Sequence, residues 1–269
     1  MNRCVLLLSC AFLVAAGCGD GTKQPPSTPS AHNALSLDAY LEAVFGQGMA
    51  TCEKDADCIS GVCERDSYLA IGTDTGLCLG LPGAYMRWQR TLLAEGVAEG
   101  LKAHPEWAEP FLIEVQKRYD SGLPDGEKEA FLLMARAVGN VDANAWLAQC
   151  FDEMPEGGLK TFTAVLLAHA GDLRGRDLIA DAALSSVVRT RLLGIDGGAA
   201  MCDELGHGIL AEGLTDAHPL IRRRSAQGLA RCHTKQGKKL LEERLHALQQ
   251  NDYPPDGEIF PLESALSKW

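Results

Sequence analysis

Hydrophobic residues between residues 84 and 250 recur at intervals of three and four, which is the spacing of one face of an α-helix. The clearest stretches are Trp88, Leu92, Leu93, Val97 and Leu101; Phe111, Leu112, Val115 and Tyr119; and Phe131, Leu132, Ala135 and Val138. The same spacing predicts helices over 141–153, 158–170, 173–184, 186–194, 198–213, 219–232 and 237–249. Alternating β-branched clusters, which are typical of strands, do not occur in this part of the sequence. We therefore predict an all-α domain over residues 84–250.

Aspartate lies at four of the breaks between these predicted helices, where a short carboxylate can cap exposed N–H groups. The four residues are Asp142, Asp172, Asp196 and Asp216, separated by 30, 24 and 20 residues. These spacings indicate at best a degenerate repeat.

The clearest unit begins with Leu210 and Leu214, continues through Asp216-Ala217-His218-Pro219-Leu220-Ile221-Arg222, and ends with Ala226, Leu229, Leu240, Leu241 and Leu245. This stretch resembles a HEAT repeat, in which an Asp-x-x-Pro-x-Val-Arg turn joins two antiparallel helices. Pro219 suits the first helical position, and Arg222 can reach the turn carbonyls or the Asp of a neighbouring unit. The resemblance implies a HEAT-like α-solenoid, because one such pair cannot bury its own hydrophobic face.

The first twenty residues have the form of an export signal. Met1-Asn2-Arg3 is followed by an apolar run over 4–16, which is too short to span a bilayer. The break Val14-Ala15-Ala16-Gly17-Cys18 resembles a bacterial lipobox, which implies removal of the leader and attachment of acyl chains such as palmitate to Cys18. Gly19 after the cysteine implies the outer membrane of a Gram-negative bacterium. Ordinary secretion of a periplasmic or secreted chain is the alternative.

Residues 19–34 contain almost nothing apolar and predict a disordered tether. A short helix is then predicted from Leu37, Tyr40, Leu41 and Val44, between Ser36 and two glycines at 46 and 48. A helix of this length is not stable alone, so its apolar stripe must dock on another part of the protein.

Ten cysteines are present, and two of them leave with the leader while Cys18 carries the lipid. Those that remain are disulfide candidates, because an exported chain folds in an oxidising space: Cys52, Cys58, Cys63, Cys78, Cys150, Cys202 and Cys232. The stretch from Cys52 to Cys63 is similar to a small cysteine-rich module of exported bacterial lipoproteins, and we assign residues 35–83 to the short helix plus this module. Four cysteines allow three pairings, of which analogy with interlaced small modules favours Cys52–Cys63 with Cys58–Cys78.

A second group of potential ligands lies near the clearest helical unit: Cys202, Asp203, His207, Cys232 and His233. None of these pairs has the close spacing of a metal site. We favour a Cys202–Cys232 disulfide that ties adjacent helices, with the histidines on the surface and no metal or cofactor. Cys150 is then the leftover thiol, buried on the Trp146–Leu147 face.

The charge is uneven along the chain. Without residues 1–18 the net charge is −12, of which residues 19–219 carry −15 and residues 220–269 carry +3. An acidic body argues against nucleic acid as a partner. The basic stretch offers partner-binding candidates, although a solvated helix face explains the same pattern: Arg222, Arg223, Arg224, Arg231 and Lys235.

Local catalytic motifs such as Gly-x-Ser-x-Gly, His-Glu-x-x-His and a Walker loop do not occur in the sequence. We therefore expect a non-catalytic envelope lipoprotein that binds or scaffolds another envelope protein through its solenoid. The alternatives are a small-ligand or metal carrier with a helical cleft near Cys202, His207 and His233, and an enzyme without a local motif. The tail over 251–269 is expected to cap the end of the helical stack.

Overall fold

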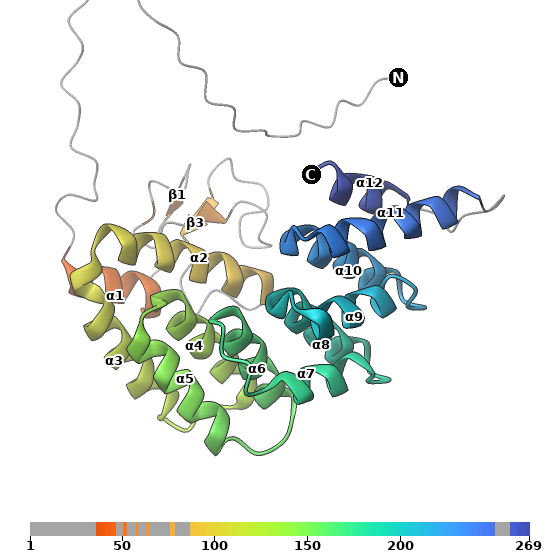
Figure 1. Cartoon of the computed structure of the whole chain (residues 1–269). Helices are drawn as coiled ribbons and strands as arrows, with labels where there is room; N and C mark the ends of the chain where they lie inside the picture. The colour runs from red at the N-terminus through yellow and green to blue at the C-terminus, as the bar shows by residue number, and fades with distance from the viewer. Residues whose placement is uncertain are drawn as a thin grey trace, which may run out of the picture. The chain divides into compact units, whose positions relative to one another are not determined.

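The computed structural model describes residues 36–46, 51–52, 58, 63–64, 76–78, 87–250 and 259–269, all within one unit that spans Leu35–Trp269. The predicted leader, Cys18 and the tether lie outside the described residues. The elements are α1 (Leu37–Phe45), β1 (Thr51–Cys52), β2 (Cys63–Glu64), β3 (Gly76–Cys78), α2 (Arg87–Ala103), η4 (Pro105–Trp107), α3 (Ala108–Tyr119), α4 (Asp125–Val138), α5 (Val141–Glu153), α6 (Gly158–His169), α7 (Arg176–Ala183), α8 (Val188–Met201), α9 (Glu204–Gly213), α10 (Pro219–Cys232), α11 (Lys235–Gln249) and α12 (Ile259–Leu266) (Figure 1). No helix of the described part is long and apolar enough to cross a bilayer.

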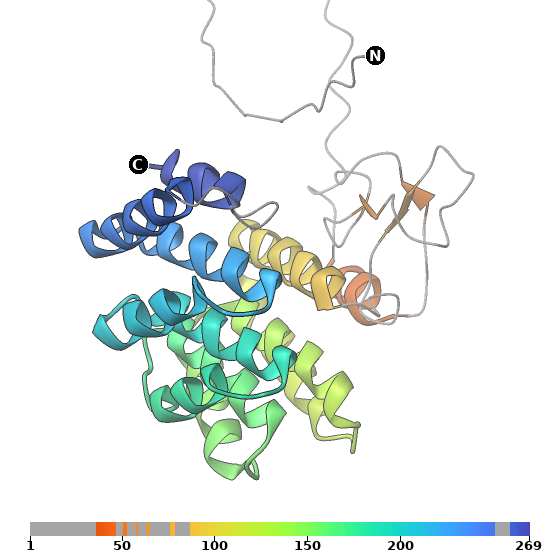
Figure 2. The ribbon, with the colours of Figure 1, turned by 90° about the vertical axis from the view of Figure 1, so that its right-hand side faces the viewer.

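The domain is all-α. Its helices form pairs that repeat along the stack and build two layers. Helices pack in the pairs α3/α4, α5/α6, α7/α8, α9/α10 and α11/α12. The even-numbered helices also pack on one another from α2 to α12, so they form one continuous layer (Figure 2). In the other layer α9 contacts both α7 and α11. This arrangement is the α-solenoid that the sequence predicts.

The repeat is more regular than the aspartate spacings suggested. Helices α4, α6, α8 and α10 begin at Asp125, Gly158, Val188 and Pro219, so successive starts lie 33, 30 and 31 residues apart. A nearly constant interval places equivalent side chains of successive pairs at similar points of the stack. The period of the fold is therefore about 31 residues.

Three connectors between successive pairs share one design. Each consists of a residue in the left-handed region followed by a residue that caps the next helix: Gly139–Asn140, Cys202–Asp203 and His233–Thr234, with φ of 69°, 50° and 49° at the first position. The capping side chains accept N–H bonds from the residue three positions later, at 2.8 Å for Asn140, 2.8 Å for Asp203 and 3.0 Å for Thr234. These bonds satisfy helix N-terminal donors that would otherwise lack partners.

The predicted break between 194 and 198 is wrong. Helix α8 continues through Asp196, Gly197 and Gly198 and ends at Met201, so Asp196 caps nothing. The two glycines lie at close helix crossings instead of a turn. A Cβ on Gly197 would lie 2.5 Å from the Ile179 side chain, and one on Gly198 would lie 3.0 Å from the Ile209 side chain.

Two of the other predicted aspartates lie at breaks, as expected. Asp172 accepts the N–H of Arg174 at 3.0 Å, and Asp216 accepts the N–H of His218 at 2.7 Å. Asp142 lies in the first turn of α5, but the cap of that helix is Asn140.

The short helix α1 docks on the helical core, as its apolar stripe requires. Tyr40 is buried, and its ring centroid lies 5.3 Å from that of Trp107 and 6.1 Å from that of Phe111. The ring of Phe45 packs on Phe111 at 5.2 Å. Gly100 of α2 leaves room for the Tyr40 hydroxyl, which would lie 2.5 Å from an added Cβ. These contacts anchor α1 on η4 and α3.

The cysteine-rich module contains a three-stranded antiparallel sheet in the order β1-β3-β2. In this sheet Cys52 pairs with Gly76, and Cys63 pairs with Cys78. Cys58 is buried and disulfide-bonded. The side chains of the other three cysteines lie outside the described residues, so the pairing Cys52–Cys63 with Cys58–Cys78 stays a prediction.

Candidate functional site

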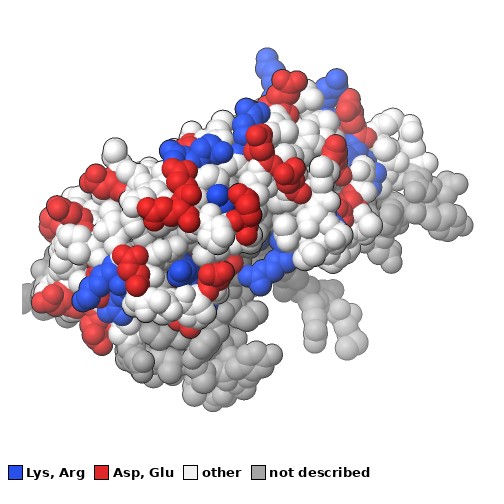
Figure 3. Space-filling model, turned by 90° about the horizontal axis from the view of Figure 1, so that it is seen from below, with Lys and Arg blue, Asp and Glu red and all other residues white. Residues whose placement is uncertain are grey.

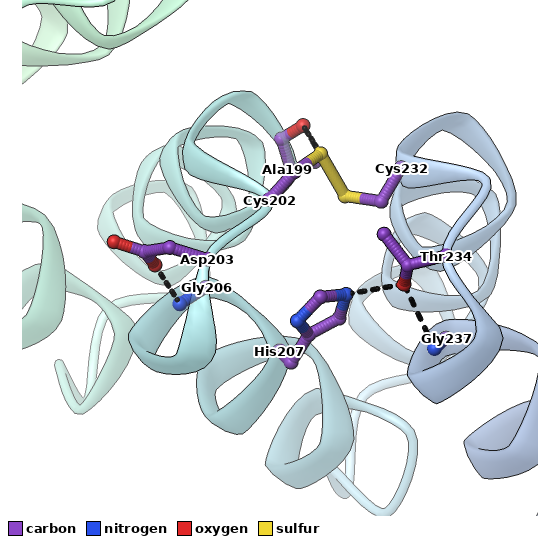
Figure 4. Close-up of a disulfide and its surroundings, with 8 residues drawn as sticks. All are labelled: Ala199, Cys202, Asp203, Gly206, His207, Cys232, Thr234 and Gly237. Carbon is purple, nitrogen blue, oxygen red and sulfur yellow. Dashed lines mark hydrogen bonds between the residues drawn. A yellow bond between two sulfur atoms is a disulfide. The ribbon is translucent and has the colours of Figure 1, made fainter.

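The predicted disulfide between Cys202 and Cys232 is present. It joins the end of α8 to the end of α10, with the two Cα atoms 5.3 Å apart and a sequence separation of 30 residues (Figure 4). The Sγ atom of Cys202 lies 3.3 Å from the carbonyl oxygen of Ala199. The bond therefore locks two neighbouring helices of the even-numbered layer at the same end.

His207 lies below this disulfide and points from α9 toward the next connector (Figure 4). Its Nε2 atom lies 2.7 Å from the Oγ1 atom of Thr234, which also accepts the N–H of Gly237 at 3.0 Å. A threonine hydroxyl can accept one hydrogen bond while it donates or accepts another. His207 therefore connects α9 to the cap of α11.

The structure does not bring the predicted ligand candidates together around a metal. The two sulfur atoms are bonded to each other, so neither is a thiolate ligand. His233 stacks on Trp269 with the ring centroids 5.0 Å apart, away from the Thr234 contact of His207. Within the described residues, no three His, Cys, Asp or Glu side chains are placed to hold a metal ion.

An open groove of about 610 Å³ remains between α9 and α11 beside this disulfide. Polar side chains from His207, Asp203 and Gln236 line it, together with the apolar Ala211 and Leu240. Such a mixed lining suits a partner's polar side chain better than a wholly apolar ligand.

Cys150 is the free, buried thiol that the sequence predicts. Burial, together with smaller contributions from the nearby carboxylates of Glu153 and Asp120, raises the pKa of this thiol to about 12. Because the thiolate is the reactive form, such a cysteine is chemically inert in the folded protein.

The basic candidates divide into two groups. Arg222 belongs to the α9–α10 turn: its Nη1 atom donates to the carbonyl oxygens of Asp216 at 2.7 Å and Ala217 at 2.9 Å. The other four are exposed: Arg223, Arg224, Arg231 and Lys235. On the face drawn in Figure 3, acidic and basic side chains are interspersed, so neither sign covers that face alone.

Arg231 also affects a histidine of an earlier repeat. Burial lowers the pKa of His169, and the positive charges of Arg136 and Arg231 lower it further, against the opposing charge of Asp196. The Nη2 atom of Arg136 donates to the carbonyl oxygen of His169 at 3.1 Å. Side chains from α4, α6, α8 and α10 thus influence one another electrostatically along the even-numbered layer.

Arg191 is not among the residues that the sequence predicts for the site, yet in the α7–α8 turn it makes the contacts that Arg222 makes 31 residues later. Its Nη1 atom donates to the carbonyl oxygens of Ser185 at 2.8 Å and Ser186 at 3.0 Å. Its Nε atom lies 3.0 Å from the Asp216 carboxylate of the next turn. The 31-residue offset would have revealed this residue, but Ser185 and Val188 stand where the recognisable turn has Asp216 and Pro219.

The disulfide closes a loop of 30 residues, so its loss should lower the free energy of unfolding by about 3–4 kcal/mol in the chain-entropy description. We expect this for Cys202→Ser and for Cys202→Gly, each combined with Cys232→Ser, in urea denaturation. The glycine variant should be more stable by about 1 kcal/mol, because residue 202 has a left-handed φ of 50°. Stability equal to that of the wild type in both variants would contradict this account.

Comparison with known proteins does not place the chain in a family. No protein-family model matches it, and no curated protein sequence matches it significantly. Among solved structures, it is similar to the crystal structure of an engineered protein from the Northeast Structural Genomics Consortium. The two are 12% identical with a TM-score of 0.41, over 70% of this chain and 94% of that chain. At this TM-score we infer neither fold nor function from the likeness.

Proposed function

We propose that this protein is a non-catalytic lipoprotein of the cell envelope that binds another envelope protein through its α-solenoid. The observation that carries the proposal is a group of exposed cations on α10 and at the start of α11. Within the described residues, Arg223, Arg224 and Lys235 have no ion-pair partner. An acidic patch on a partner protein would supply the missing counter-charges.

The repeat architecture supports binding over an extended surface. Because each helix pair packs mainly on its neighbours along the stack, the pairs present a continuous row of equivalent positions. A partner that spans several repeats gains contacts from each of them. The same regularity does not assemble a catalytic constellation by itself, since function must come from particular side chains.

The lipid anchor would place this surface close to a membrane. A tether of sixteen residues, as the sequence predicts for 19–34, would span roughly 20–25 Å on average, so the solenoid would stay within reach of other membrane-attached proteins. Two or more acyl chains on Cys18 would make the attachment stable. Binding and anchoring together define a scaffold at the envelope.

Charge reversal on α10 tests the binding surface. We expect the variant Arg223→Glu/Arg224→Glu to recover at least about tenfold less of the crosslinked envelope partner in a pull-down, because the attraction becomes a repulsion. The matched control is Lys102→Glu/Lys117→Glu, which makes the same change in charge at exposed lysines of α2 and α3. Equal recovery by the wild type and both variants would reject this surface, and thermal unfolding checks that each variant is folded.

The anchor is tested by metabolic labelling with palmitate. We expect the wild type to be labelled and to sediment with membranes, and Cys18→Ala to be unlabelled and to remain in the soluble fraction. Cys4→Ala is the control, because this residue lies in the predicted leader and should leave labelling unchanged. A wild-type chain without label would contradict the anchor.

A further inference from the structure

A second groove lies between the neighbouring helices α7 and α9 and has a volume of about 490 Å³. Small and apolar residues from both helices line it: Ala180, Ala183 and Leu184 on one side, and Leu205, Gly208 and Ile209 on the other. Leu184 is 73% exposed, and the nearby Val187 is 57% exposed. This end of the groove therefore presents apolar surface that the described part of the chain does not cover.

The rim of this groove is acidic. Glu204 and Glu212 line it together with one cation, Arg176. Within the described residues, no ion pair or hydrogen bond involves the carboxylate of either glutamate. On α7, Asp177 and Asp181 are exposed and lie in the same helical row as Leu184, at intervals of four and three residues. An apolar floor between unpaired carboxylates complements a segment that carries apolar and basic side chains together.

We propose that the α7–α9 groove binds a basic amphipathic helix of the partner protein. This proposal rests on the proposed function and specifies the chemistry of the partner. A helix fits better than an extended peptide, because the groove walls are helices whose own backbone groups are already bonded. An extended segment would leave its N–H and C=O groups without partners there. Helices α7 and α9 have 8 and 10 residues, so the contact extends over about 12–15 Å, or two to three helical turns.

The glycine at position 208 is consistent with the close approach of a partner helix to α9. It lies inside α9, where glycine weakens a helix relative to alanine. Other glycines of α8 and α9 are required by packing, since an added Cβ on Gly194, Gly206 or Gly213 would lie within 2.5 Å of a neighbouring atom. Apart from its two chain neighbours and the backbone of its own helix, no atom of the described residues lies within 4 Å of a Cβ placed on Gly208. The chain's own packing therefore does not explain this glycine, whereas a partner helix against α9 does.

The probe is a fluorescein-labelled amphipathic peptide of about 14 residues built from Leu and Lys, and its counterpart with Glu in place of Lys. Anisotropy titration of the full mature chain should show that the lysine peptide binds at least about tenfold more tightly than the glutamate peptide. Raising the salt concentration should weaken binding of the lysine peptide. No binding of the lysine peptide, or equal binding of both peptides, overturns the proposal.

Variants locate the binding in the groove. Gly208→Trp fills it and should weaken the lysine peptide at least about tenfold, whereas Gly208→Ala adds a single methyl group and should weaken it by a smaller factor. Leu184→Ser should weaken binding, and Val141→Ser is its control because Val141 is an exposed apolar residue on α5. Equal affinity of all four variants shows binding elsewhere and overturns the groove. This outcome is independent of the charge reversal on α10, so failure of this inference and failure of the proposed function are distinguishable.

A second copy of this chain is the competing occupant, because α11 carries exposed lysines and Phe260 of α12 is 74% exposed. Sedimentation of the wild type should show a monomer at the protein concentrations of the titration. A dimer that Gly208→Trp abolishes and Gly208→Ala retains would overturn the partner helix in favour of self-association.

Discussion

Arg191 and Arg222 each donate two hydrogen bonds to carbonyl oxygens of the turn that precedes their own helix, and Asp216 links the two turns. Carbonyl groups in such turns have no partner within a helix, and leaving them unsatisfied near the core costs free energy. The guanidinium groups satisfy several of them at once. Because Arg191 also pairs with the carboxylate of the next turn, this contact sets how one helix pair stacks on another.

The opposite ends of the even-numbered helices are held by different means. There, two-residue connectors turn the chain through a left-handed residue and a capping side chain. The disulfide spans the ends of α8 and α10 at this level. With both ends fixed, α7, α9 and α11 stand at defined separations and leave the two grooves that flank α9. The proposed binding surfaces therefore follow from how the turns are built.

The sequence predicted the helices whose boundaries depend on local chemistry. Helix α10 begins at Pro219 as expected, and α5 has the predicted bounds. The sequence did not predict features that depend on packing between helices far apart in the chain. Gly197 and Gly198 resemble a turn, but their role depends on Ile179 and Ile209, which come from other helices. Likewise, the sequence placed Cys202 near Cys232, but it could not show that His233 would stack on Trp269 while His207 contacts Thr234.

The most direct test of this account compares Arg191→Met with Arg189→Met by urea denaturation of the mature chain. Arg191 is mostly buried, so its loss should lower the free energy of unfolding by about 2–4 kcal/mol, because turn carbonyls and the Asp216 carboxylate lose their partner. Arg189 is 73% exposed and contacts Glu129 at 3.4 Å, so its loss should cost less than about 1 kcal/mol. Equal stability of the two variants would contradict the claim that the turn arginines hold the stack together.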